Sequence, residues 1–169
     1  MAAFDAATVR AAIVGRAIGT HTNALGNNIT VGTVLAGIAT THDDDEQADL
    51  AIVKPRFRVE LLAMTPRAAV SGSISGATRF SDLSVKGTLT HAVKGVDLDD
   101  ETTRNATLDA AGTMAQAITR ALETEGTAAM RTAGLVGGRL KCRGWKRSRL
   151  DRELLEHQLD LIGILEENP

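Results

Sequence analysis

The chain has 169 residues, a length typical of one domain, and its 19 basic and 21 acidic residues leave a formal net charge of −2. That balance, with a sequence pI near 6.1, argues against a dedicated nucleic-acid-binding protein. Hydrophobic residues make up 43% of the chain, yet it contains three Phe, one Trp and no Tyr. We therefore expect a single domain over residues 1–169 with an aliphatic core.

The longest stretch without a charged residue, residues 17–41, is too rich in Gly, Asn and Thr to be a membrane span. The first residues lack the basic start of a signal peptide, and the only cysteine, Cys142, leaves no partner for an intramolecular disulfide. These features predict a soluble, cytoplasmic protein in a reducing compartment. Cys142 itself is expected to be a small buried hydrophobic residue.

The first predicted element is a helix over residues 5–19, because Asp5 suits the N-cap position and Val9 and Ile13 lie at helical spacing. Residues 20–54 show no clear periodicity and run into an acidic stretch. That stretch consists of Asp43, Asp44, Asp45 and Glu46. It is typical of a solvated loop, and the functional alternative is an acidic knob that meets a basic partner.

Two strands are predicted next, over residues 57–64 and 82–93. Alternation in the first places Phe57, Val59, Leu61 and Ala63 on one face. In the second, one face carries Leu83, Val85, Leu89, His91 and Val93, and the other carries Ser84, Lys86, Thr88 and Thr90. Each strand is thus expected to have a core-facing side.

A long helix is predicted within residues 96–126, with an apolar stripe and with close packing at Gly112. Two further strands, over residues 139–147 and 153–165, flank a segment short enough for a hairpin loop. The second has Leu155, His157, Leu159, Leu161 and Leu165 on one face. The order of elements predicts an α+β fold, a mainly antiparallel sheet with two helices packed on one face.

Residue patterns that carry catalysis are not found. The four histidines are scattered, the glycines of residues 134–141 lack the spacing of a phosphate-binding loop, and no serine sits in a nucleophile elbow. The expectation is a protein that is not an enzyme and holds no cofactor or metal.

The basic ribbon, residues 139–149, carries six Lys or Arg residues beside the only tryptophan. Alternation predicts that Leu140 and Cys142 point inward and that Arg139, Lys141, Arg143 and Trp145 point outward, with Lys146, Arg147 and Arg149 extending the charge. Three interpretations stay open: a solvated edge strand, a protein interface, or a nucleic-acid-binding module. Because the acidic residues lie in other segments, the pattern also suits a head-to-tail ring.

The run "GRLKCRGWKRSRLDRELLEHQLDLIGILEE", after a long Ala-rich helix, resembles the tail terminator (tail completion) proteins of tailed bacteriophages. The resemblance implies a ring, commonly a hexamer, that ends tail-tube polymerisation and joins the tail to the neck. It also implies the partners: further copies of the chain, the tail tube protein, neck or connector proteins, and non-specific contact with DNA in the lumen. The expected location is the virion, after assembly in the host cytoplasm. Another neck, head-completion or tail-tube protein is the alternative.

Overall fold

The computed structural model describes residues 5–17, 19–22, 28–31, 34–36, 56–67, 79–93, 95–124 and 128–167. In chain order the elements are α1 (Ala6–Ala17), β1 (Gly19–Thr22), β2 (Asn28–Val31), β3 (Val34–Ala36), β4 (Arg56–Pro66), β5 (Arg79–Ala92), α3 (Glu101–Glu123), α4 (Ala128–Thr132), η1 (Val136–Gly138), β6 (Lys141–Leu150) and β7 (Leu154–Glu167). No helix among these is long and apolar enough to cross a membrane.

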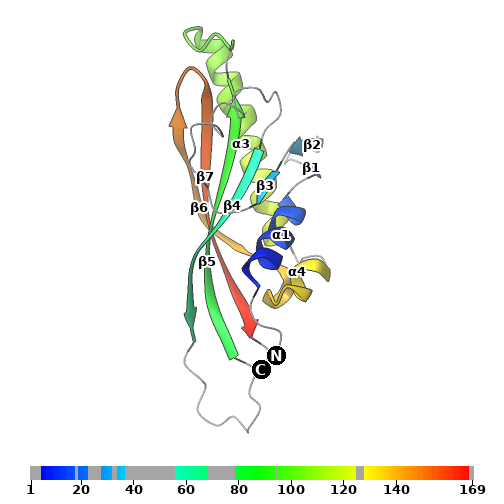
Figure 1. Cartoon of the computed structure of the whole chain (residues 1–169). Coiled ribbons are helices and arrows are strands. Elements are labelled where there is room, and N and C mark those ends of the chain that lie inside the picture. Colours follow the sequence, from blue (N-terminus) through cyan, green and yellow to red (C-terminus); the bar gives the residue numbers. More distant parts are fainter. Residues whose placement is uncertain are drawn as a thin grey trace.

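The main sheet has the strand order β3-β4-β5-β7-β6, and a separate antiparallel pair is formed by β1 and β2. All neighbours in the main sheet are antiparallel except β3 and β4, which are parallel. Helices α1, α3 and α4 lie on one side of this sheet (Figure 1). The predicted α+β class and its mainly antiparallel sheet are confirmed, and we call the side facing the helices the inner face and the opposite side the outer face.

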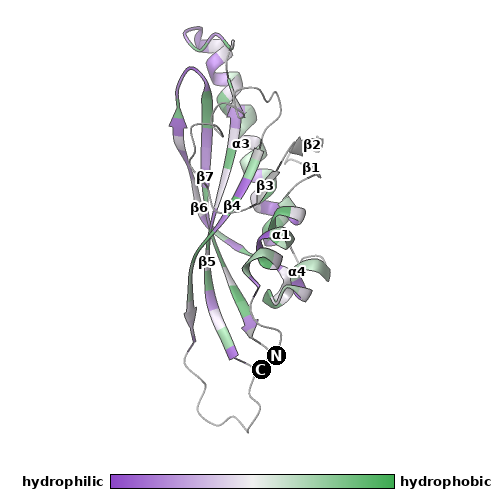
Figure 2. Cartoon of the chain, in the orientation of Figure 1, coloured by the Kyte–Doolittle hydropathy of each residue, from purple (hydrophilic) through white to green (hydrophobic). Residues whose placement is uncertain are grey.

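The core lies between the inner face and the helices, and it is aliphatic as expected. Figure 2 shows hydrophobic and hydrophilic residues alternating along the long strands. Fully buried residues come from every layer: Phe57 and Val59 of β4, Leu83, Val85 and Leu89 of β5, Leu159, Leu161 and Leu165 of β7, Ile13 of α1, and Ile118 and Leu122 of α3. Phe57 is the one aromatic residue among the described members of this core, and its ring fits because its neighbour on β5 is Gly87, where a Cβ would lie 2.8 Å from the ring.

Both long helices begin at aspartates. The Asp5 carboxylate accepts a hydrogen bond from the backbone N–H of Ala7 (3.0 Å), and Asp100, the N-cap of α3, accepts one from that of Thr103 (2.8 Å). Helix α3 therefore begins later than residue 96, and an ordered turn precedes it. These caps satisfy N–H groups that the first helical turn leaves without partners.

Strand β4 corrects one sequence prediction. Its register against β5 shifts between Leu61, which pairs with Val85, and Ala63, which pairs with Ser84. The extra residue, Leu62, moves Ala63 to the outer face, because a bulge reverses the alternation that follows it. Ala63 therefore does not share the core-facing side as predicted.

Candidate interaction surface along strand β6

Strand β6 lies at one end of the strand order, and within the described residues it pairs only with β7. Its register shifts twice, between Cys142 and Gly144 and between Arg147 and Arg149, so that Arg143 and Ser148 are the extra residues of two bulges. An edge strand exposes backbone hydrogen-bonding groups, and bulges with cationic side chains prevent further strands from pairing there.

The register fixes the face of each side chain, because directly paired antiparallel residues point the same way. On the outer face are Lys141, Lys146 and Arg149, which pair with Ile162, Gln158 and Glu156. On the inner face are Cys142, Trp145, Arg147 and Leu150, which pair with Leu161, Leu159, His157 and Leu155. Leu140 is buried but precedes the strand, and Arg139 is exposed beside it.

The predicted alignment of Trp145 with Lys141 on one outward face is therefore wrong. Simple alternation holds from Lys141 to Cys142, and the bulge at Arg143 then reverses it. The structure keeps Lys141, Lys146 and Arg149 together and turns Trp145 and Arg147 to the other side of the strand.

Trp145 packs partly against helix α3. A Cβ built on Gly112 would lie 3.5 Å from Cη2 of the indole, an ordinary van der Waals contact, so the indole lies over this glycine but leaves room for a methyl group. The indole also lies 5.3 Å from the imidazole of His157, centroid to centroid, and 40% of the residue stays exposed. Leu150, on the same face, is 37% exposed. The inner side of the β6 edge thus presents apolar surface.

Cys142 is half-buried rather than fully buried. Its backbone N–H donates to the Glu123 carboxylate at the end of α3 (3.0 Å), and its Sγ donates to the carbonyl of Gly144 across the first bulge (3.3 Å). The residue packs against the core, as its expected hydrophobic character requires, and joins the start of β6 to α3.

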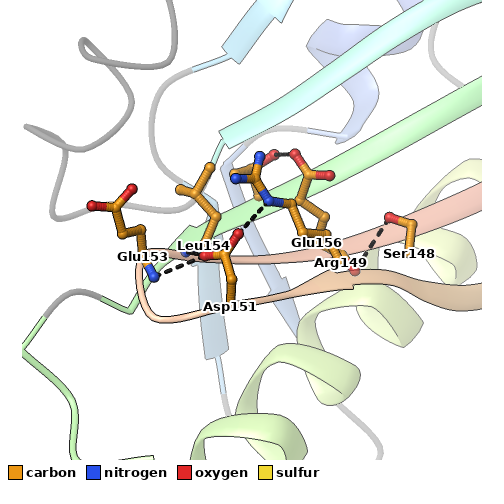
Figure 3. A network of polar contacts seen from close by, with 7 residues as sticks. Ser148, Arg149, Asp151, Glu153, Leu154 and Glu156 are labelled. Carbon is orange, nitrogen blue, oxygen red and sulfur yellow. Dashed lines mark hydrogen bonds and ion pairs between the residues drawn. The ribbon is translucent and has the colours of Figure 1, made fainter.

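The turn between β6 and β7 is organised by Asp151 (Figure 3). Its carboxylate accepts hydrogen bonds from the backbone N–H groups of Glu153 (2.8 Å) and Leu154 (2.7 Å) and pairs with the Arg149 guanidinium (2.5 Å). Slight burial opposes the ionised form, but the hydrogen bonds from Leu154 and Glu153 and the charge of Arg149 together lower the pKa of Asp151.

The other cations of the basic ribbon form no ion pair with the described part of the chain. Among the described residues, the ion pairs outside this turn join Arg67 to Asp82 and Lys86 to Glu60. The ribbon cations that take part in none are Arg139, Lys141, Arg143, Lys146 and Arg147. The acidic knob proposed from the sequence, formed by Asp43, Asp44, Asp45 and Glu46, lies outside the described residues.

Two histidines of the inner face, His91 and His157, meet beside Trp145, and no sequence pattern had singled them out as functional. The rings of His91 and His157 are 6.5 Å apart and meet edge to face, and His157 is 3% exposed. Nε2 of His91 and Nδ1 of His157 have no hydrogen-bond partner among the described residues. Burial, with the charge His157 would carry, lowers the pKa of His91 to about 4, and burial and Arg147 lower that of His157.

His91 also borders an open depression of about 530 Å³. The depression is lined by His91, Val93, Val96 and the α3 residues Thr102, Thr103, Ala106, Thr107, Ala110 and Ala111. Its walls are mostly small and apolar. No group of three or more His, Cys, Asp or Glu side chains in the described part of the chain is placed to hold a metal ion.

The chain matches no protein-family model and no curated protein. The α+β fold and the β6 surface therefore provide the basis for a functional proposal.

Proposed function

We propose that this chain is a structural subunit of a phage tail. Its copies associate into a ring at the head-proximal end, where the ring ends tail-tube polymerisation and joins the tail to the neck. The observation that carries the proposal is the inner side of the β6 edge, where Arg147, which forms no ion pair among the described residues, shares a face with the partly exposed Trp145. Arg and Trp are the residues most enriched at protein interfaces.

The charges favour a contact between different surfaces of two copies. The basic ribbon lies along β6 and just before it, whereas Asp97, Asp99 and Asp100 of the turn before α3, with Glu101 at the start of that helix, are acidic. A contact between two different patches is heterologous, and a series of such contacts forms a closed ring when the rotation closes. The bulges at Arg143 and Ser148 favour side-chain contacts over continued strand pairing.

The assignment to a tail rests on the resemblance of the closing run to tail terminator proteins. The elements behind that resemblance, a long helix followed by two strands, are α3, β6 and β7. The partners expected on this basis are the tail tube protein and the neck or connector proteins, and the location is the virion. The role is assembly rather than catalysis.

The positions of the cations weigh against nucleic acid as the main partner. A surface that binds single-stranded nucleic acid combines cations that neutralise phosphates with an aromatic residue on which bases stack. Here the indole of Trp145 is on the inner face, whereas Lys146 and Arg149 are on the outer face, which also carries Asp160 and Glu156 of β7. Binding that survives moderate salt and is lost on replacing Lys146 and Arg149 with Ala would favour the nucleic-acid-binding module instead.

Light scattering and negative-stain images of the purified protein, alone and with tail tubes, test the proposal. We expect closed rings in solution and rings seated on tube ends. Long tubes formed by the protein alone would assign it to the tube, and attachment to heads without tube capping would assign it to head completion. A monomer at all concentrations that caps no tube would overturn the proposal.

A further inference from the structure

The inner side of the β6 edge has an unusual composition for an exposed strand. Trp145, Arg147 and Leu150 lie on it in sequence, so that a cation separates two partly exposed apolar residues. We call these three residues the inner edge. Arg147 forms no ion pair among the described residues, and an exposed indole beside such a cation is typical of a protein interface.

The acidic turn, residues 96–101, is its opposite in charge. Four of its six residues are acidic and none is basic, and Val96 is 36% exposed. In Figure 1 the segment between β5 and α3 lies at the upper tip of the molecule. It is therefore placed where another molecule can reach it.

The acidic turn is also rigidly held. Oδ1 of Asp97 accepts hydrogen bonds from the backbone N–H groups of Asp99 (3.1 Å) and Asp100 (3.3 Å). Leu98 packs against the small core cluster of Val93, Ala111 and Leu155. A preordered segment loses little conformational freedom on docking, which favours association.

Within one chain, the charges of the acidic turn and of the inner edge do not pair with each other among the described residues. The ion pairs among the described residues involve neither the carboxylates of the acidic turn nor Arg147. Arg104, the first cation after the turn, donates to the backbone carbonyl of Leu98. Each surface combines an apolar side chain with charges of one sign, Val96 beside Asp97 and Trp145 beside Arg147.

We infer that the acidic turn of one copy docks on the inner edge of β6 of the next copy, and that this contact is the repeating junction of the assembly. The inference rests on the proposed ring, and it identifies which surfaces form the junction. In it, Arg147 pairs with the carboxylates of the turn, and Val96 covers part of the exposed indole of Trp145. Opposite charges then fix the orientation of neighbouring copies.

Charge reversal on each side tests the junction. Arg147→Glu and Asp99→Lys are each expected to raise the dissociation constant of the assembly by about tenfold or more, because each opposes like charges across a close contact. Asp99 is chosen because its carboxylate makes no intrachain hydrogen bond in the described structure, whereas Asp97 and Asp100 hold backbone N–H groups.

The chain offers matched controls for both changes. Lys146→Glu makes the same charge change one residue away but on the outer face, and Asp109→Lys reverses an exposed acid of α3 outside the turn. Both are expected to leave the dissociation constant within about threefold of the original, since screened charges outside the contact contribute little. Circular dichroism of every variant checks that the fold is kept.

The double variant with Arg147→Glu and Asp99→Lys decides the pairing. It restores opposite charges across every junction and is expected to regain the ring that each single change weakens. Trp145, the only tryptophan, provides a second measurement, because covering the indole on assembly shifts its emission to shorter wavelength.

The outcomes separate the junction from the ring itself. Wild-type rings that withstand both single changes, or a double variant that stays dissociated, would overturn the junction and leave the ring standing. A wild-type chain that never associates would overturn both proposals. A shift in Trp145 emission on adding a single-stranded oligonucleotide, with none on raising the protein concentration, would assign the inner edge to nucleic acid and overturn the junction.

Discussion

Replacing His91 with Leu is expected to make the unfolding free energy less sensitive to acid, so that the variant loses less stability than the wild type between pH 7.5 and pH 5. Burial and the nearby His157 hold the pKa of His91 at about 4, below its ordinary value of 6.5. The folded chain therefore binds this proton less readily than the unfolded chain does. The contribution of neutral His91 is complete above pH 6.5 and decreases as the pH falls toward 4.

The magnitude follows from the size of the shift. A difference of roughly 2.5 pKa units corresponds to about 3 kcal/mol in the limit of low pH, of which about 2 kcal/mol is already lost at pH 5. His157, whose pKa is also lowered, adds to the loss in the same direction. Nε2 of His91 has no hydrogen-bond partner among the described residues, so the apolar replacement breaks none that the structure shows.

Urea unfolding followed by circular dichroism at pH 7.5, 6.5, 5.5 and 5 measures the effect. The difference in unfolding free energy between the wild type and the His91→Leu variant should change by about 2 kcal/mol across this range. Carboxylates that titrate near pH 5 are common to both chains and cancel in the difference. A difference that stays constant within about 0.5 kcal/mol would refute the reasoning that a buried neutral imidazole sets the acid sensitivity.

Two further pairs of substitutions test the packing. Gly87→Ala places a Cβ 2.8 Å from the Phe57 ring and should lower the unfolding free energy by about 1–3 kcal/mol. Gly144→Ala, where a Cβ would meet nothing within 4 Å, should leave the unfolding free energy unchanged. Equal effects of the two substitutions would contradict the close approach of Gly87 to Phe57. Leu159→Ala should cost about 2–5 kcal/mol in the same urea assay, because the residue is fully buried. Leu150→Ala should weaken association with little loss of stability, and the reverse result would place Leu150 in the core rather than at the junction.

The faces of β5 and β7 could be predicted from the sequence because their alternation is unbroken. Leu83, Val85 and Leu89 on one strand, and Leu159 and Leu161 on the other, are buried as expected. A side chain points to the opposite face from its neighbour wherever the strand is regular, so burial follows from position alone. Helix α3 was predictable for a similar reason, since its apolar stripe recurs at three and four residues.

The candidate interaction surface along β6 was less predictable, because two bulges decide which side chains share a face. The hydrophobic and polar alternation of residues 139–147 does not mark Arg143 as an extra residue, and the alternation from Lys141 would send Trp145 outward. Gly144 was the one available signal, since a glycine within a strand often accompanies a bulge. The bulge at Leu62 in β4 had no such signal. The contact between His91 and His157 depended on which strands pair, which single-strand patterns do not contain.

The two bulges of β6 cancel each other in phase. Cys142, before the first bulge, and Leu150, after the second, both point inward at even positions, whereas Trp145 and Arg147 between them point inward at odd positions. Deleting Arg143 alone would exchange the two faces over one side of the strand, moving either the indole or Cys142 to the opposite side. Deleting Arg143 and Ser148 together would leave every inward residue in place. In this strand, the side chains therefore keep their faces only when both extra residues are present or both are absent.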